Sequence, residues 1–184
     1  LGKFLLDGSL YQGFKPVFWS TVEKTALADA EVEYENHTSN TIFVGFKVKN
    51  TQKFFLKDTN IIIWTTTPWT IPANRALAYN KNIEYSLIEI SELENFKEKK
   101  IIVATNLLDS VIKSCEIKKF KILKTFNGNE FEGTICEHPF KALAYNHDVP
   151  MLEAKFVTLE QGTGIVHCAP SHGPDDFNLC LKHN

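Results

Sequence analysis

The chain has no hydrophobic run that approaches the length of a membrane-spanning helix, and its N-terminus lacks the basic-then-apolar pattern of a signal peptide. It also lacks an excess of either charge, because 20 lysines and arginines stand against 22 aspartates and glutamates. A net charge of −2 exerts no general attraction on nucleic acid, so a nucleic acid partner would be held weakly and locally. We therefore expect no membrane partner and a cytoplasmic location.

Cysteine and methionine are both scarce. The cysteines have an irregular spacing that does not form a disulfide framework, which favours a reducing compartment. The only methionine is Met151, position 1 is leucine, and the chain ends in a helix-like pattern without a capping glycine or proline. We interpret both ends as excision points from a longer protein.

Several catalytic motifs are absent as well. The glycines around Thr163 have the spacing of neither nucleotide-binding fingerprint, so the chain alone should not bind ATP. The G-x-S-x-G elbow of a serine hydrolase does not occur. Cys168 has His167 beside it, but neighbours along a strand point to opposite faces, and no third group orients the pair. We therefore expect neither nucleotide binding nor a serine or cysteine nucleophile.

The sequence does contain a long series of short β-like segments. Apolar or alternating runs separated by turn residues predict strands at 15–20, 31–36, 41–50, 61–67, 76–79, 84–90, 101–105, 118–126, 131–137, 154–159 and 164–169. Helical patterns cover 1–13, 21–30, 106–114 and the segment from 175 onward. We expect a hairpin to join 31–36 to 41–50, and residues 91–100 to form a charged, solvated connector.

These elements predict a fold class. The regular strand–helix alternation of a doubly wound sheet is missing, and many short strands at irregular spacing are typical of barrels. We therefore predict an α+β, β-rich fold with a mixed β-barrel core and short peripheral helices. A length of 184 residues suits a single domain that spans 1–184.

The stretch WTTTPWTIPANR at 64–75 places three consecutive threonines behind an apolar run. The β-branched and aromatic residues 61–64 suit a strand that is buried on both faces. Pro68 and Pro72 must end it, because proline cannot donate to a ladder. The hydroxyls therefore lie where a rigid strand meets a loop, a common place for a functional site. In a regular strand the middle threonine would face away from the other two.

The second dense stretch is EQGTGIVHCAPSHGPDDF at 160–177, in which a short strand leads to a stiff loop and then to a helix. Asp175 and Asp176 open that helix, where the helix dipole favours acidic residues. Capping accounts for one aspartate. The other could hold the ammonium group of a ligand by charge-assisted hydrogen bonds.

A metal site is the alternative interpretation of this stretch. A series that is superficially like a zinc site is formed by Cys168, His172, Cys180 and His183. Against zinc, the first pair straddles a proline and the last pair lies at the chain terminus. We expect no metal, while a zinc-stabilised domain, which would lose its fold on chelation, stays open as an alternative.

Together, the stretches at 64–80 and 162–177 resemble the editing domain of isoleucyl-tRNA synthetase, the connective polypeptide inserted in the catalytic core of this class I synthetase. Residues 15–36 resemble the beginning of the same insertion. The related valyl and leucyl enzymes carry an arginine after two threonines, whereas Thr-Thr-Thr-Pro-Trp-Thr looks like the isoleucyl form. The resemblance spans almost the whole chain, and it implies that 1–14 and 177–184 are junctions to a parent catalytic domain.

The resemblance also implies roles for individual residues. Asp176 would anchor the α-ammonium group of the substrate, which leaves helix capping to Asp175. His167 would lie where the amino acid side chain is sized, unless it is merely a hydrogen-bonded core histidine. Thr65, Thr66 and Thr67 would line the pocket with hydroxyls and backbone groups. These groups would contact the terminal adenosine and position a water.

Two further residues complete the implied site. Asn74 matches a pocket residue of the family, although it could simply cap a turn. Trp64 is a candidate substrate contact as well, although both Trp64 and Trp69 suit a hydrophobic core. His172 and Gly173 are expected to shape the loop.

The activity that the resemblance implies is hydrolysis of the ester of valyl-tRNA(Ile), with valyl-adenylate as a second candidate substrate and with isoleucine excluded. The implied partners are the 3′ acceptor end of tRNA(Ile) and the parent catalytic domain, which would itself use ATP. We expect a monomer with no cofactor of its own. The alternative is a binding module that holds the tRNA end but is inactive without the parent enzyme.

Overall fold

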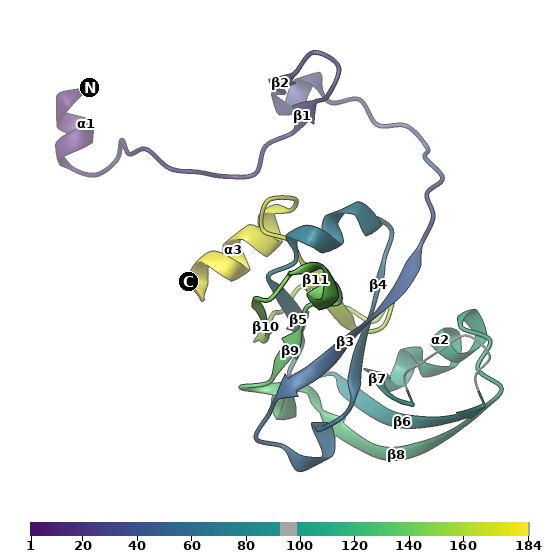
Figure 1. Cartoon of the computed structure of the whole chain (residues 1–184). Helices are drawn as coiled ribbons and strands as arrows, with labels where there is room; N and C mark the ends of the chain where they lie inside the picture. Colours follow the sequence, from purple (N-terminus) through teal and green to yellow (C-terminus); the bar gives the residue numbers. More distant parts are fainter. Residues whose placement is uncertain (93–98, 184) are drawn as a thin grey trace. The chain divides into compact units, whose positions relative to one another are not determined.

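The computed structural model of the chain describes residues 1–92 and 99–183, which fall into two compact units, 1–36 and 37–184 (Figure 1). The first unit contains α1 (Gly2–Leu6), β1 (Trp19–Ser20), β2 (Thr25–Ala26) and the 3-10 turn η1 (Asp29–Glu31). β1 and β2 pair in an antiparallel hairpin, with Trp19 opposite Ala26. Nothing in this unit is longer than five residues.

Several predictions for this unit are wrong. The segment 21–30, expected to be a helix, forms the hairpin turn, β2 and part of η1. The helix at 1–13 is limited to Gly2–Leu6, and the segments 15–20 and 31–36 are mostly without regular structure. Within the unit, every side chain is exposed or half-buried. The residues of this unit therefore have only their local propensity, with no buried core to stabilise a helix. Short helices without such packing are marginally stable.

The second unit contains a sheet of nine strands in the order β11-β5-β10-β9-β3-β4-β7-β6-β8. The strands are β3 (Ile42–Asn50), β4 (Asn60–Thr65), β5 (Ala76–Tyr79), β6 (Glu84–Glu92), β7 (Lys100–Ala104), β8 (Lys119–Asn127), β9 (Ile135–Glu137), β10 (Asp148–Glu153) and β11 (Ile165–Cys168). The sheet is mixed, because β5 pairs with β10 and β4 with β7 in parallel while the other pairs are antiparallel. The predicted β-rich α+β class is confirmed.

Short helices lie between these strands. They are η2 (Phe54–Leu56), η3 (Pro68–Ala73), η4 (Thr105–Leu107), α2 (Leu108–Ser114), η5 (Gly128–Phe131), η6 (Lys141–Leu143) and α3 (Pro174–Lys182). The helices predicted at 106–114 and from 175 onward are confirmed by α2 and α3. The longest helix in the described part of the chain, α3, has nine residues, and none there is able to cross a bilayer.

The sheet curls so that β11, at one end of the strand order, approaches β7 and β6 near the other end. The N–H of Ala104, at the end of β7, donates to the carbonyl of Thr163, just before β11, at 2.8 Å. The Tyr85 hydroxyl on β6 donates to the carbonyl of Gly164 at 2.8 Å. These bonds join opposite sides of the strand order, as a barrel requires.

The core follows from the apolar runs of the central strands. Ile61 and Ile63 of β4 point into the larger cluster of buried side chains, and Ile62 points into the smaller one under α2. Neighbouring residues of β4 thus serve opposite faces, which explains why this strand is continuously apolar.

Two predictions for the second unit need correction. The hairpin partner of β3 is β4, and its other neighbour is β9, so the expected pairing of 41–50 with 31–36 is wrong. The strand expected at 154–159 lies instead at β10, where Pro150 disguised it. Ala154 and Val157 are buried without belonging to a strand, which explains the misleading alternation. Most of the connector predicted at 91–100 lies outside the described residues.

Gly164 occupies the closest point of this closure. Its φ is +74°, and a Cβ added there would lie 2.4 Å from the Cβ of Ala104. We expect Gly164→Ala to lower the free energy of unfolding by about 3 kcal/mol, because overpacking adds to the cost of a left-handed backbone. Urea denaturation measures the loss. Gly133→Ala is the control, since φ there is +70° with no atom within 4 Å of the added Cβ. Equal losses at both positions would contradict a role for the close approach.

Candidate functional site

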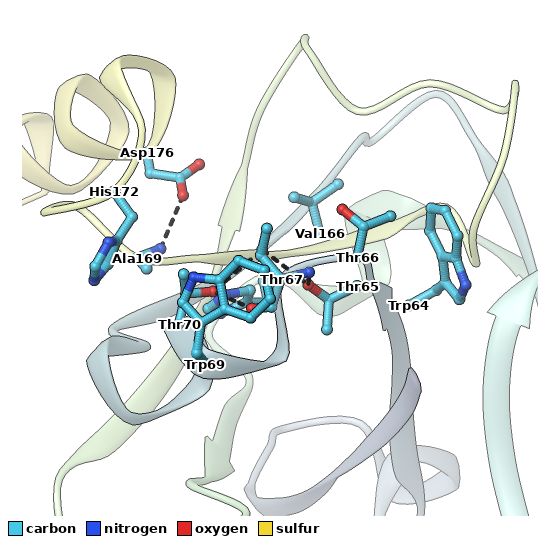
Figure 2. Close-up of a pocket in the computed structure, with 11 residues that line it drawn as sticks. Trp64, Thr65, Thr66, Thr67, Trp69, Thr70, Val166, Ala169, His172 and Asp176 are labelled. Atoms are coloured by element: carbon cyan, nitrogen blue, oxygen red, sulfur yellow. Dashed lines mark hydrogen bonds between the residues drawn. The ribbon is translucent and has the colours of Figure 1, made fainter. Parts of the chain in front are cut away.

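The two motif-bearing stretches meet at one pocket of about 370 Å³ (Figure 2). One wall comes from the end of β4 and from η3, and the other comes from β11, the loop after it and the first turn of α3. The lining residues are Trp64, Thr65, Thr66, Thr67, Trp69, Thr70, Val166, His167, Ala169, His172 and Asp176. The structure therefore brings together every predicted site residue except Asn74, which lies directly behind His167.

The threonines lie at the end of β4, as the prolines predicted. The strand ends at Thr65, and Pro68 begins η3. The hydroxyl oxygens of Thr65 and Thr67 are 3.3 Å apart, while Thr66 is exposed. Alternation thus separates the middle threonine from the other two. All three nevertheless line the pocket, because the chain leaves the strand after Thr65.

His167 has a hydrogen bond at each ring nitrogen. The side-chain amide nitrogen of Asn74 lies 2.9 Å from His167 Nδ1 and 2.9 Å from the carbonyl of Ala76. An amide nitrogen only donates, so Nδ1 accepts and the ring proton sits on Nε2. Nε2 faces Thr70 Oγ1 at 2.8 Å, and this hydroxyl donates to the carbonyl of Thr67 at 2.8 Å. The ring is locked in one tautomer.

The His167 ring is also neutral. Burial, followed by the neighbouring His172 and His138, lowers its pKa to about 4. A neutral ring with both nitrogens engaged presents a fixed wall to the pocket. It cannot act as a general base without first giving up the bond to Asn74.

Asp176 lies in the first turn of α3, facing the pocket. Its Oδ2 accepts a hydrogen bond from the N–H of Ala169 at 2.9 Å. The residue at the helix cap is Gly173, and no side chain caps it. Burial raises the pKa of Asp176 above its ordinary value, although the bond from Ala169 opposes this shift. Asp176 is therefore a partly desolvated carboxylate that would gain from a cation, whereas Asp175 is exposed.

Cys168 is buried beside this carboxylate. Burial and the charge of Asp176 raise the pKa of its thiol. The thiol consequently stays protonated at neutral pH.

The tryptophans differ from the expectation of a core role. Trp69 is 65% exposed and lines the pocket, so a core position for it is wrong. Trp64 is half-buried against Gly162 and lines the pocket as well. Trp64 is the penultimate residue of β4 and Trp69 lies in η3, so both stand at the rim where the strand gives way to the turn. Sequence reasoning also missed Thr70, whose only signal was a fourth hydroxyl in the same motif.

The alternative zinc site finds no support in the structure. Within residues 1–92 and 99–183, no group of three or more histidine, cysteine, aspartate or glutamate side chains could hold a metal ion. Cys168 is fully buried, and His183 lines a different pocket with Tyr79 and Glu132.

Comparison with solved structures gives the class of the fold. The crystal structure of GlLeuRS-CP1 matches over 78% of this chain and 59% of its own, with a TM-score of 0.62 and 17% identity. The editing domain of the P. knowlesi cytosolic leucyl-tRNA synthetase matches over 65% of this chain and 48% of its own, with a TM-score of 0.53 and 17% identity. The fold is that of the editing domains of class I synthetases.

Sequence comparison gives the family. The family model described as tRNA synthetases class I (I, L, M and V) matches residues 1–158, and the chain belongs to this family. It is similar to the isoleucine–tRNA ligases of Pelagibacter ubique (strain HTCC1062), 67% identical over 183 residues, and Gluconobacter oxydans (strain 621H), 50% identical over 189 residues. Both matches cover 100% of this chain and 20% of the relative, so the chain spans about a fifth of each. The predicted resemblance to isoleucyl-tRNA synthetase is confirmed.

Proposed function

We propose that the pocket is an editing site that hydrolyses the ester of valyl-tRNA(Ile) and excludes the isoleucyl ester. One observation carries the proposal: a partly buried carboxylate, a neutral locked histidine and a row of threonine hydroxyls converge on one pocket from two distant stretches of the chain. These are an anchor for an ammonium group, a wall, and donors for an ester and a water.

The need for such a site follows from recognition physics. A synthetic pocket sized for isoleucine admits valine, since one missing methylene is worth only about 1–3 kcal/mol, a general figure whose standard illustration is isoleucyl-tRNA synthetase itself. A second and smaller site must therefore admit valine, reject isoleucine and destroy the wrong ester. The wall for this selection would be His167.

Asp176 would hold the α-ammonium group of the valyl ester. A desolvated carboxylate gains from a cation, and a charge-assisted hydrogen bond contributes roughly twice as much as a neutral one. The ammonium would also lower the pKa of Asp176 and keep it ionised. Asp176 is then occupied by the substrate and does not serve as a base.

Hydrolysis itself would depend on positioning and electrostatics. The hydroxyls of Thr65 and Thr67, joined at 3.3 Å, and the exposed Thr66 would hold a water and the terminal adenosine. The water oxygen attacks the carbon of the ester carbonyl and gives up a proton, the bond from that carbon to the ribose oxygen breaks, and the ribose oxygen takes up a proton, so that valine is released. With His167 engaged at both nitrogens, the hydroxyl of the substrate's own ribose is the proposed partner of the water.

The remaining parts of the proposal concern the surroundings of the site. We propose the 3′ end of tRNA(Ile) and a parent catalytic domain as partners, a cytoplasmic location, a monomeric chain, and no metal or other cofactor in this domain. ATP would be used by the parent domain alone. Valyl-adenylate is a second candidate substrate, because it presents the same ammonium and side chain.

A binding module without activity is the second candidate function. It is favoured by the net charge of −2, which gives the chain little hold on tRNA in the absence of further contacts. In that case the pocket would bind a valyl-adenosine analogue but release no valine.

The test is deacylation of valyl-tRNA(Ile) and isoleucyl-tRNA(Ile) by the chain. We expect release of valine and retention of isoleucine, because the wall acts on the side chain that differs. Release of neither amino acid, with a valyl-adenosine analogue bound, would support the binding module. Equal release of both would contradict selective editing.

A further inference from the structure

Two buried or half-buried histidines lie close to the pocket without lining it. His138 follows β9 and is 2% exposed, and His147 comes just before β10 and is half-buried. Their ring centroids are 4.9 Å apart. Neither belongs to the two stretches that supply the pocket, and neither has a part in the proposed hydrolysis.

Both rings bond the backbone of η3 and its cap. His138 Nδ1 accepts from the N–H of Phe140 at 3.1 Å, so Nε2 carries the proton and donates to the carbonyl of Ile71 at 2.9 Å. His147 Nε2 lies 2.8 Å from the carbonyl of Asn74. A carbonyl only accepts, so His147 is the donor here.

The segment they hold contains two residues that cannot donate a backbone hydrogen bond, because Pro68 and Pro72 lack an N–H. Backbone bonds run from Thr70 to Thr67 and from Asn74 to Ile71 at its two ends. The two histidines add side-chain donors to the carbonyls of Ile71 and Asn74. The His138 ring is itself held by packing, because the Tyr145 ring stacks on it with the two ring centroids 4.9 Å apart and an interplanar angle of 16°.

This segment is also what locks His167. The Asn74 side chain donates to His167 Nδ1, and Thr70 accepts from Nε2. His147 therefore holds the backbone of the residue whose side chain sets the tautomer of the pocket wall. We propose that His138 and His147 are positioning residues that fix η3 and, through Asn74 and Thr70, hold His167 in the orientation that rejects isoleucine.

The effect on selectivity rests on the proposed function, but the effect on His167 does not. The two can be measured separately. Nitrogen-15 NMR of the histidine rings reports the tautomer and the titration of His167 whether or not the chain hydrolyses anything.

The informative pair of variants is His147→Phe and His147→Gln. Phenylalanine keeps an aromatic ring beside His138 but has no donor, whereas glutamine keeps an N–H that can reach the carbonyl of Asn74. With His147→Phe, we expect the His167 titration to move from about 4 toward the ordinary value of about 6.5 and its single tautomer to become mixed. His147→Gln should preserve both signals. His37→Gln, at an exposed position outside the pocket, is the control.

The same variants test selectivity. His147→Phe should reduce the preference for the valyl over the isoleucyl ester about 10-fold, since a misplacement of about 1 Å can cost up to about 100-fold, and His147→Gln should preserve it. Unchanged His167 signals in a folded His147→Phe chain would overturn the positioning role. Altered signals in a chain that hydrolyses neither ester would uphold that role while the proposed function fails.

Discussion

Asp176→Asn is expected to reduce hydrolysis of valyl-tRNA(Ile) by about 100-fold, because it removes the charge and little else. Asparagine has almost the same shape, and its amide oxygen can still accept the bond that Ala169 donates at 2.9 Å. A hydrogen bond to a charged group contributes about 1.5–3 kcal/mol, and each 1.4 kcal/mol changes a rate about tenfold. Single-turnover deacylation measures the loss.

Asp175→Asn provides the matched control. It removes the same charge from the same turn of α3, but at an exposed position. Surface charges contribute little, so hydrolysis should stay within about twofold. A loss as large as that of Asp176→Asn would mean that the general field of the helix start matters and that Asp176 is no specific anchor.

Stability should move in the opposite direction to activity. Burial raises the pKa of Asp176, so the folded chain binds this proton more tightly than the unfolded chain. Its contribution to stability is then present at low pH and is lost as pH rises from the unfolded value through the raised folded value. Asparagine does not ionise, so Asp176→Asn should stabilise the free chain at pH 7 and lose this advantage in acid. Urea denaturation at both pH values tests this sign.

His167→Ala is expected to have the second large effect, on selectivity. The ring is held at both nitrogens and is a fixed wall, so alanine leaves space that an isoleucyl side chain can fill. Discrimination of one methylene is worth about 10- to 200-fold at most, a general range illustrated by this family of enzymes, so most of the preference for the valyl ester should disappear. Parallel deacylation of both esters measures it.

The same histidine leads to a prediction about how selectivity depends on pH in the unsubstituted chain. With a pKa of about 4, His167 stays neutral throughout the neutral range, so selectivity should not change between about pH 6 and 8. His37→Ala, at an exposed position, should leave selectivity intact. Retention of full selectivity by His167→Ala would show that another group sizes the substrate.

The elements that could be predicted from the sequence are those whose hydrophobic pattern matches the burial they have in the fold. β4 was predictable because a run of isoleucines suits a strand with two buried faces, and α3 because proline and aspartates begin it. β10 was hidden by Pro150, and residues 1–36 were misread because their side chains have no packed core to join. Pairing of strands far apart in sequence, such as β5 with β10, leaves no local signal.

The candidate site shows the same division. The threonines and the pair Asp175–Asp176 stood out because polar side chains gather at element ends, whereas the roles of Asp176 and His167 came from the resemblance to the family. The links between them could not be predicted, since a bond such as that from Asn74 to His167 spans 93 residues. No pattern in the sequence distinguishes His138 and His147, and only their distances to the carbonyls of Ile71 and Asn74 set them apart.

The position of the tryptophans has an optical consequence. Trp64 and Trp69 both line the pocket, and the third, Trp19, belongs to residues 1–36. Replacing Trp19 with phenylalanine would leave a tryptophan emission that arises wholly from the pocket. A non-hydrolysable aminoacyl-adenosine could then be titrated against the unlabelled chain, and its occupancy read directly from the two indoles that flank it.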